Sequence, residues 1–144
     1  MRITSKDDLL TRQNEVQNTI GTYTCRVLVC SGTGCMASGA QKIYDEMVKL
    51  CEDMEGVQVE MQKDVPHLGV IKTGCQGLCE LGPLMRIEPY DYQYVHVQPE
   101  DCREIVERTV LQGQPVERLF YREDDKACPH PDDIPFLNQQ TRIV

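Results

Sequence analysis

Two pairs of cysteines in glycine-rich stretches are the residues of this sequence whose types and spacing can do chemistry. Cys30 and Cys35 flank the residues SGTG, and Cys75 and Cys79 lie in the stretch TGCQGLCELGP. Each pair follows a short apolar run typical of a strand, so we expect both loops at the same edge of a sheet. Glycine allows backbone N–H groups to turn toward thiolates and removes side chains that would crowd a cluster. Because four neighbouring thiolates repel one another, a cation must hold them together.

The spacing within each pair separates the possible chemistries. Thioredoxin-type thiol exchange uses two cysteines at the start of a helix with two residues between them. Neither Cys30-x4-Cys35 nor Cys75-x3-Cys79 has that spacing. A structural zinc site also takes four cysteines, most often with two residues between them. A 2Fe–2S cluster takes four thiolates and tolerates wider loops. Spacing alone therefore favours an iron–sulfur cluster and leaves zinc, disulfides and free thiols as alternatives.

Composition limits the class of protein. The chain has 144 residues, eight cysteines and a net charge of −8, which fits one domain with tails and argues against a nucleic-acid partner, since that would need a basic stripe. It has no apolar run long enough for membrane insertion and no signal-peptide core in its polar N-terminal region. We therefore expect a cytoplasmic protein, in which clustered cysteines bind metal or do redox work.

The elements that would position the cysteines form an alternating series. A helix over 4–20 is capped by Ser5. The strand Cys25–Cys30 is apolar almost throughout, which predicts a central strand covered on both faces. A helix over 38–53, strands over 57–61 and 69–73, a hairpin over 84–88 and 93–97, and a helix over 99–111 follow. This order predicts an α/β sandwich with a mixed sheet.

The remaining cysteines and the C-terminal region are expected to have structural roles. Cys51 and Cys102 lie on apolar helix stripes, and Cys25 begins a strand, so we expect all three in the core. Residues 116–121 predict one more strand, and the charged, proline-rich residues 122–135 predict a linker. Cys128 and His130 in that linker are half of a metal site without a second pair.

Three stretches together carry a resemblance to a known family. The strand with Cys30-SGTG-Cys35, the segment KTGCQGLCELGP and the segment QPEDCREIVERTV resemble the thioredoxin-like 2Fe–2S ferredoxin domain over residues 25–112. The resemblance implies a thioredoxin-like sandwich with a mixed sheet of four to five strands, and a 2Fe–2S cluster ligated by Cys30, Cys35, Cys75 and Cys79. Extra length between Gly56 and Leu68 departs from the family pattern and leaves the strand register there open.

A narrower resemblance concerns the larger context. IEPYDYQYVHVQPEDCREIVERTV and ACPHPDDIPFLNQQTRIV are similar to the N-terminal region of the NADH-binding flavoprotein subunit of multimeric, electron-bifurcating iron–sulfur hydrogenases, relatives of the complex I NADH dehydrogenase module. This implies an N-terminal helical extension over 1–22, a ferredoxin domain over 23–112, and a strand and linker over 113–144 leading toward a flavin and NADH domain outside this chain.

The implied function is one-electron transfer within a larger enzyme. The domain itself would make or break no bond, FMN and NADH would belong only to the parent subunit, and the partners would be other subunits or domains of an NADH-linked iron–sulfur flavoenzyme. The alternative is a zinc-bound structural module that holds a larger assembly together.

Overall fold

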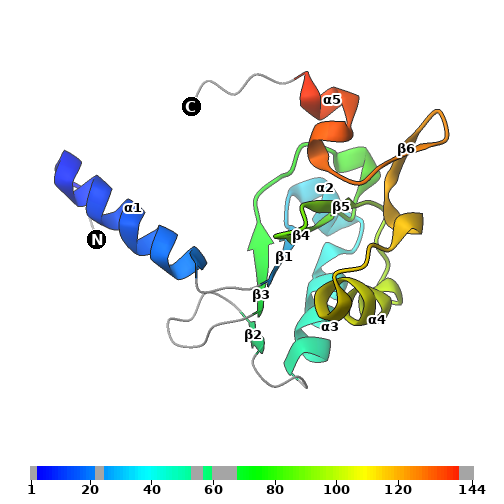
Figure 1. Cartoon of the computed structure of the whole chain (residues 1–144), viewed down its shortest axis with the longest axis horizontal. Helices are drawn as coiled ribbons and strands as arrows, with labels where there is room; N and C mark the ends of the chain where they lie inside the picture. Colours follow the sequence, from blue (N-terminus) through cyan, green and yellow to red (C-terminus); the bar gives the residue numbers. More distant parts are fainter. Residues whose placement is uncertain (1–2, 22–24, 53–56, 60–67, 140–144) are drawn as a thin grey trace.

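A mixed five-stranded sheet forms the centre of the molecule (Figure 1). The computed structural model describes residues 3–21, 25–52, 57–59 and 68–139. The strand order is β2-β3-β1-β4-β5, with β2, β3 and β1 parallel and with β4 and β5 antiparallel to their neighbours. The strands are β1 (Cys25–Cys30), β2 (Val57–Val59), β3 (Leu68–Thr73), β4 (Met85–Glu88) and β5 (Tyr92–Tyr94). The predicted α/β architecture with a mixed sheet is confirmed, and residues 60–67, where the register was left open, lie outside the described part.

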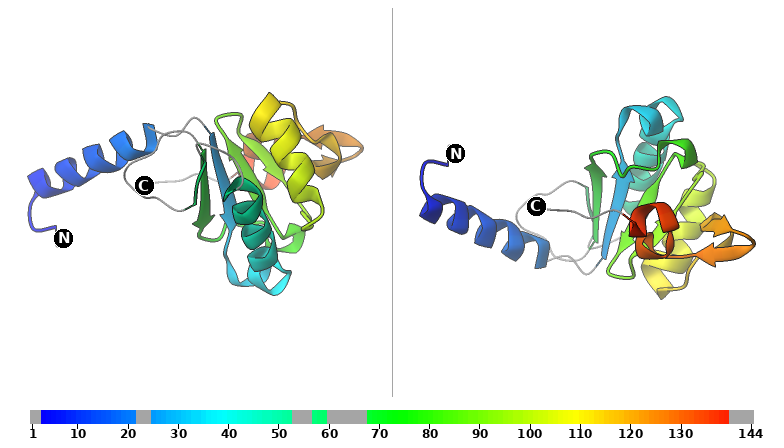
Figure 2. Two further views of the ribbon diagram at one scale, coloured as in Figure 1. Left: turned by 90° about the horizontal axis from the view of Figure 1, so that it is seen from below. Right: turned by 90° about the horizontal axis from the view of Figure 1, so that it is seen from above.

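Helices α3 (Ala40–Glu52) and α4 (Asp101–Glu104) cover one face of the sheet (Figure 2). The predicted stripe of α3 points inward, because Ile43, Met47 and Cys51 are almost fully buried. On the opposite face of β1, Arg26 and Leu28 are only half-buried. The expectation that β1 is covered on both faces is therefore wrong: Arg26 forms an ion pair with Glu88 on that open face.

Several elements differ in length from their prediction. Strand β5 ends at Tyr94 rather than Val97, because His96 has a left-handed backbone (φ 49°) that interrupts the ladder. The helix predicted over 99–111 is α4 followed by a π-helical segment, Ile105–Val110. The predicted N-terminal helix is α1 (Lys6–Gly21), and the Ser5 hydroxyl accepts a hydrogen bond from the Asp8 N–H at 3.1 Å, which confirms the predicted cap.

The C-terminal region is more ordered than a linker. Strands β6 (Tyr121–Glu123) and β7 (Lys126–Cys128) form a hairpin, and α5 (Pro135–Asn138) follows it. Residues 116–119 do not form the predicted strand, which begins only at Tyr121. The linker prediction over 122–135 is wrong because apolar side chains spaced along the charged sequence pack onto the core, among them Cys128 and Ile134.

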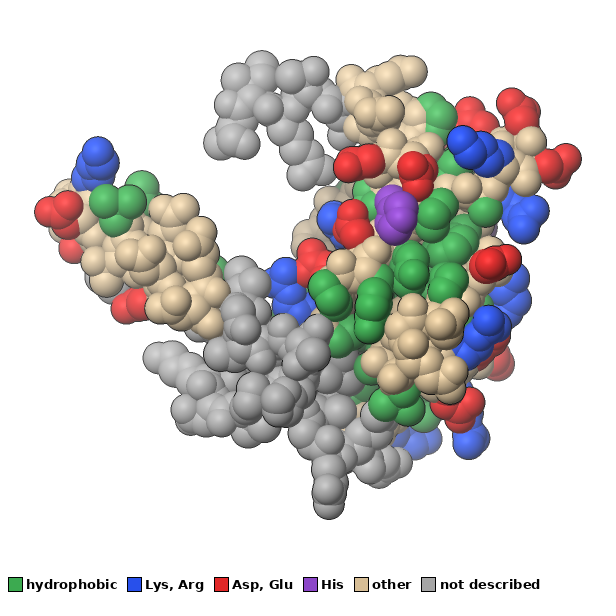
Figure 3. Space-filling view, in the orientation of Figure 1, with side chains coloured by type: hydrophobic (Ala, Val, Ile, Leu, Met, Phe, Trp, Pro, Cys, Tyr) green, Lys and Arg blue, Asp and Glu red, His purple; other side chains and the backbone are tan. Residues whose placement is uncertain are grey.

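Helix α1 stands apart from α3 and α4 and exposes Leu9, Leu10 and Val16 (Figures 1 and 2). None of the described helices has the length and apolar character that crossing a membrane requires. Figure 3 shows basic side chains scattered among acidic ones on one face of the described part, rather than gathered in a stripe.

Three core cysteines predict a loss of stability at alkaline pH. Burial raises the pKa of Cys25 and of Cys51 from 9.0 to about 11, and that of Cys102 to about 12. The unfolded chain thus loses these protons first as pH rises from 9, so the stabilisation present below pH 9 is lost toward pH 11. The free energy of unfolding, measured with denaturant, should fall over this pH range, and it should fall less steeply in Cys102→Ala. An equally steep fall in Cys102→Ala would contradict a raised pKa of Cys102 as its cause.

Candidate metal centre

The parallel pairing of β1 and β3 brings the two cysteine stretches to one edge of the sheet. Cys30 is the last residue of β1 and lies opposite Thr73, the last residue of β3. Since parallel strands end at the same edge, the chain leaving β1 toward Cys35 and the chain leaving β3 toward Cys75 start side by side. The Ser31 N–H donates to the Thr73 carbonyl at 2.9 Å and continues the pairing past the strand ends.

The first cysteine stretch is a short helix and not only a glycine-rich turn. Helix α2 (Thr33–Ala37) begins directly after Gly32, and the Met36 N–H donates to the Gly32 carbonyl at 2.9 Å. This turn carries Cys35 back toward the sheet, and both Cys35 and Cys30 have no exposed surface. Sequence reasoning missed α2, because the residues SGTG are typical of a turn and poor helix formers.

The second cysteine stretch is exposed. Cys75 and Cys79 lie on the surface with their sulfurs 3.5 Å apart, and Cys79 begins a 3-10 turn, Cys79–Leu81. The His96 N–H donates to the Leu81 carbonyl at 2.8 Å and holds the end of this stretch. The four predicted ligands are thus placed as one buried pair and one exposed pair.

Glycines stand where the two stretches approach each other. A Cβ atom at Gly32 would lie 3.0 Å from the Cys75 Cβ, and one at Gly34 would lie 3.0 Å from the Cys79 Cβ. A Cβ atom at Gly82 would lie 2.9 Å from the Cys35 sulfur. Real Cβ contacts are longer than these, so only glycine lets the four cysteines come this close. The predicted role of the glycines in clearing space is confirmed.

The thiols differ in how readily they ionise. Burial, together with a hydrogen bond to Cys30, raises the pKa of Cys35 to about 11, although a backbone N–H of Leu84 opposes this. The Gly77 N–H donates to the Cys75 sulfur at 3.4 Å and lowers the pKa of that thiol, with Cys79 adding to the effect. The hydrogen bond and charge of Cys75 raise the pKa of Cys79. The donor at Gly77, whose backbone is left-handed with φ 90°, confirms the expectation that glycine lets backbone N–H groups turn toward the thiolates.

These differences predict an order of chemical reactivity in metal-free protein. Because iodoacetamide attacks the thiolate, Cys75, exposed and with a lowered pKa, should be alkylated faster than Cys79 near pH 7, and buried Cys35 last. Timed alkylation followed by peptide mass spectrometry measures the order. Equal rates at Cys75 and Cys35 would contradict this arrangement.

The other candidate residues are not brought to the centre. Cys128 is buried in the core, and His130 stacks on Tyr92 with its Nδ1 3.1 Å from the Asp91 carbonyl. Within the described ranges, no three His, Cys, Asp or Glu side chains, the four predicted ligands included, lie around the position of a single ion. Cys128 and His130 thus have packing and hydrogen-bond partners apart from the two cysteine stretches.

The donor set fits a thiolate-ligated cluster. A single tetrahedral zinc ion requires every pair of its four sulfurs to lie about 3.8 Å apart, which follows from zinc–sulfur bonds of about 2.3 Å. The cysteines instead occur as two pairs, Cys30 with Cys35 and Cys75 with Cys79, which suits a two-iron group with four thiolates. The close glycine cradle and the N–H donors to sulfur fit the same group.

Comparison with known proteins agrees with this geometry. The family model described as thioredoxin-like 2Fe-2S ferredoxin matches residues 16–110. A 2Fe-2S ferredoxin of Aquifex aeolicus is 33% identical over 85 residues, which cover 59% of this chain and 70% of the relative. A 2Fe-2S ferredoxin of Clostridium pasteurianum is 32% identical over 95 residues, 65% of this chain and 91% of the relative.

Solved structures show the same fold. A thioredoxin-like 2Fe-2S ferredoxin from Aquifex aeolicus superposes with a TM-score of 0.55 at 26% identity, covering 67% of this chain and 89% of that one. The wild-type form of that ferredoxin at 1.5 Å resolution gives a TM-score of 0.52 at 26% identity, over 70% and 99% of the two chains. The expected thioredoxin-like fold is confirmed.

Proposed function

This chain belongs to the thioredoxin-like 2Fe-2S ferredoxin family, and we propose that it transfers single electrons through a 2Fe–2S cluster held by Cys30, Cys35, Cys75 and Cys79. The observation that carries the proposal is the meeting of four cysteines, in two pairs, at the edge where β1 and β3 end. When bound, such a cluster accepts and releases one electron without bond chemistry on a substrate.

The residues of this chain would tune and shield that cluster. Cys30 and Cys35 lie in the core, which keeps water from one side, whereas Cys75 and Cys79 lie at the surface, where a partner can approach. The N–H groups of Gly77 and Leu84 donate toward sulfur and stabilise its negative charge. Such donors raise a reduction potential, and the net charge of −8 lowers it.

The test is an absorption spectrum of anaerobically purified protein before and after dithionite, with iron and sulfide assays on the same sample. The expected result is broad visible bands that bleach partly on reduction, with about two irons and two sulfides per chain. A colourless, iron-free protein with stoichiometric zinc would overturn the electron-transfer proposal and favour the structural module.

For the larger context, we propose a place in a multi-subunit, NADH-linked iron–sulfur flavoenzyme of the hydrogenase and complex I type, with the cluster passing electrons to or from a flavin domain. The sequence resemblance supports it, and so does the position of α5. Leu137 lines a pocket with Cys75, and Phe136 lines another with Cys79, so a domain that contacts α5 would lie beside the exposed ligands. A midpoint potential near that of the NAD couple would support this context, and one far above it would contradict it.

A further inference from the structure

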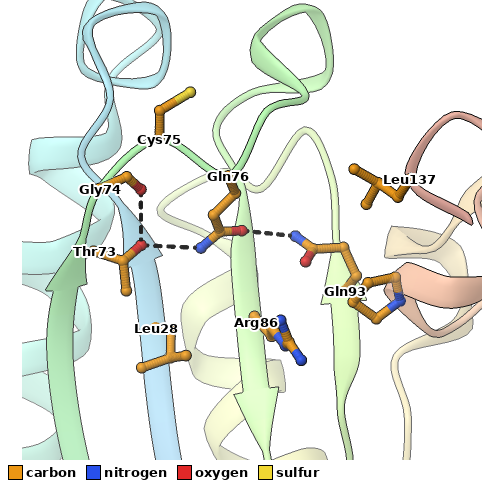
Figure 4. Close-up of a pocket in the computed structure, with 9 residues that line it drawn as sticks. Leu28, Thr73, Gly74, Cys75, Gln76, Arg86, Gln93 and Leu137 are labelled. Atoms are coloured by element: carbon orange, nitrogen blue, oxygen red, sulfur yellow. Dashed lines mark hydrogen bonds between the residues drawn. The ribbon is translucent and has the colours of Figure 1, made fainter. Parts of the chain in front are cut away.

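A cavity of about 270 Å³ lies beside the Cys75 end of the second cysteine stretch, on the open face of the sheet (Figure 4). Strand residues Leu28 and Gln93 line it, and Leu137 of α5 stands at its side. Two glutamine side chains, Gln76 from the cysteine stretch and Gln93 from β5, point toward one another across this cavity. They connect the second cysteine stretch to strand β5.

The two glutamines belong to a continuous chain of hydrogen bonds. The Gln93 amide donates to the Gln76 carbonyl oxygen at 3.1 Å, and the Gln76 amide donates to the Thr73 hydroxyl at 3.1 Å. The Thr73 hydroxyl donates to the Gly74 carbonyl at 3.1 Å, and the Cys30 sulfur lies 3.6 Å from that carbonyl. All three donors point the same way, from β5 toward the two cysteine stretches.

Gln93, where this series of hydrogen bonds starts, is held rigidly. Gln93 is 3% exposed, lies opposite Arg86 in the β4–β5 ladder, and its backbone N–H donates to the Pro129 carbonyl at 2.8 Å. A buried amide that loses its partner is costly, so Gln93 strongly favours the geometry in which Gln76 meets it. Gln93 is thus a fixed point that holds the less buried side chain of Gln76.

The two ends of the second cysteine stretch are held differently. Backbone pairing between His96 and Leu81 secures the end that carries Cys79. At the other end, backbone pairing stops at the Ser31–Thr73 hydrogen bond, and beyond it side-chain bonds of Gln76 link the residues around Cys75 to the sheet. A substitution of a side chain can therefore release the Cys75 end while leaving the Cys79 end in place.

We propose that Gln93, acting through Gln76, is a positioning residue for the Cys75 ligand. The pair fixes the Cys75 end of the stretch against β5, and so fixes the direction from which the Cys75 sulfur approaches the cluster. This inference rests on the proposed function of Cys75 as a ligand, but the hydrogen-bonded link itself exists with or without a cluster.

The variants that test it are Gln93→Leu, Gln76→Leu and the double variant, which keep side-chain size and remove the amide. Gln41→Leu is the matched control, because Gln41 is also half-buried and bonded at both ends of its amide, to Asp45 and Lys72, in contacts outside the hydrogen-bond chain from Gln93 to Thr73. Circular dichroism establishes that each variant folds, and Gln76→Leu, less buried than Gln93→Leu, provides the test if the latter does not.

In protein that carries the cluster, the readouts are the electron paramagnetic resonance spectrum and midpoint potential of the reduced protein and the rate of iron release to a chelator. We expect an altered spectrum, a shifted potential, and iron release about threefold to tenfold faster, the range that one neutral hydrogen bond provides. The double variant should match Gln76→Leu, because Gln93 acts through Gln76 and the Gln76 substitution already removes both hydrogen bonds of the link.

Cluster-free protein supplies an independent readout, the rate at which iodoacetamide alkylates Cys75. We expect a change of about threefold to tenfold in Gln93→Leu and Gln76→Leu and none in Gln41→Leu. Wild-type rates and spectra in both glutamine variants, or changes equal to those of Gln41→Leu, would overturn the inference. A wild-type protein without iron or sulfide would instead overturn the proposed function, and the alkylation rates would still decide the role of Gln93.

Discussion

Cys35→Ser should abolish cluster binding, with the iron content per chain falling more than about tenfold, since even outer residues of metal sites contribute that much to affinity. Cys35 has no exposed surface, and its sulfur is enclosed closely enough that a Cβ at Gly82 would lie 2.9 Å away. Neither water nor another side chain can take over its place in so confined a position. Serine offers a harder oxygen donor, which suits iron in a cluster less well than a thiolate.

Burial makes the four ligand positions unequal. Cys75 and Cys79 stand on an exposed stretch, where a neighbouring donor or water can reach the vacated position, so Cys75→Ser should retain more iron than Cys35→Ser. Cys128→Ser is the control, because that thiol is also buried but lies at the end of β7, outside the two cysteine stretches. Iron and sulfide assays with circular dichroism compare the three. Full iron content in Cys35→Ser would remove Cys35 from the ligand set.

The sequence predicted the positions of the cysteines well because strand signals are local. CRVLVC and GVIKT are short β-branched runs, and parallel pairing of β1 with β3 necessarily brings the residues after them together. The glycines between the cysteines indicated a close approach, which the short Cβ distances at Gly32, Gly34 and Gly82 confirm. These inferences needed only residue type, spacing and one rule about sheet edges.

The parts that the sequence did not predict depend on long-range packing. The link between Gln76 and Gln93 joins residues 17 positions apart, and nothing in either local stretch distinguishes these glutamines from exposed ones. The segment over 122–135 has the charge and proline content of a linker, and it folds because Cys128 and Ile134 find the core. Tertiary contacts of this kind override local composition.

Gly82→Ala should disrupt the arrangement of the four cysteines by steric crowding alone. Gly82 has φ −69° and ψ 160°, which alanine adopts without strain, so any effect must come from the added methyl group. That group would meet the Cys35 sulfur at 2.9 Å and the Cys79 carbonyl at 3.3 Å, one contact from each cysteine pair. Because the Cys35 side chain is fully buried and the Cys79 contact is a backbone carbonyl, neither gives way easily and the pairs must move apart. We expect the free energy of unfolding to fall by about 1–3 kcal/mol, as in other overpacked sites, with a parallel loss of iron.

Gly74→Ala is the matched control for this effect. Gly74 also lies beside a ligand, Cys75, yet a Cβ there would have no atom within 4 Å. Denaturant unfolding and iron content should therefore be near wild type in Gly74→Ala and reduced in Gly82→Ala. If both variants kept their iron, the close approach of Cys35 and Cys79 around Gly82 would be unnecessary for cluster binding. If both lost it, flexibility of the glycine backbone rather than space would govern the centre. The space between Cys35 and Cys79 at Gly82 is too small for a methyl group, whereas the space at Gly74 is open. Steric crowding therefore predicts that Gly82→Ala loses iron and stability and that Gly74→Ala keeps both.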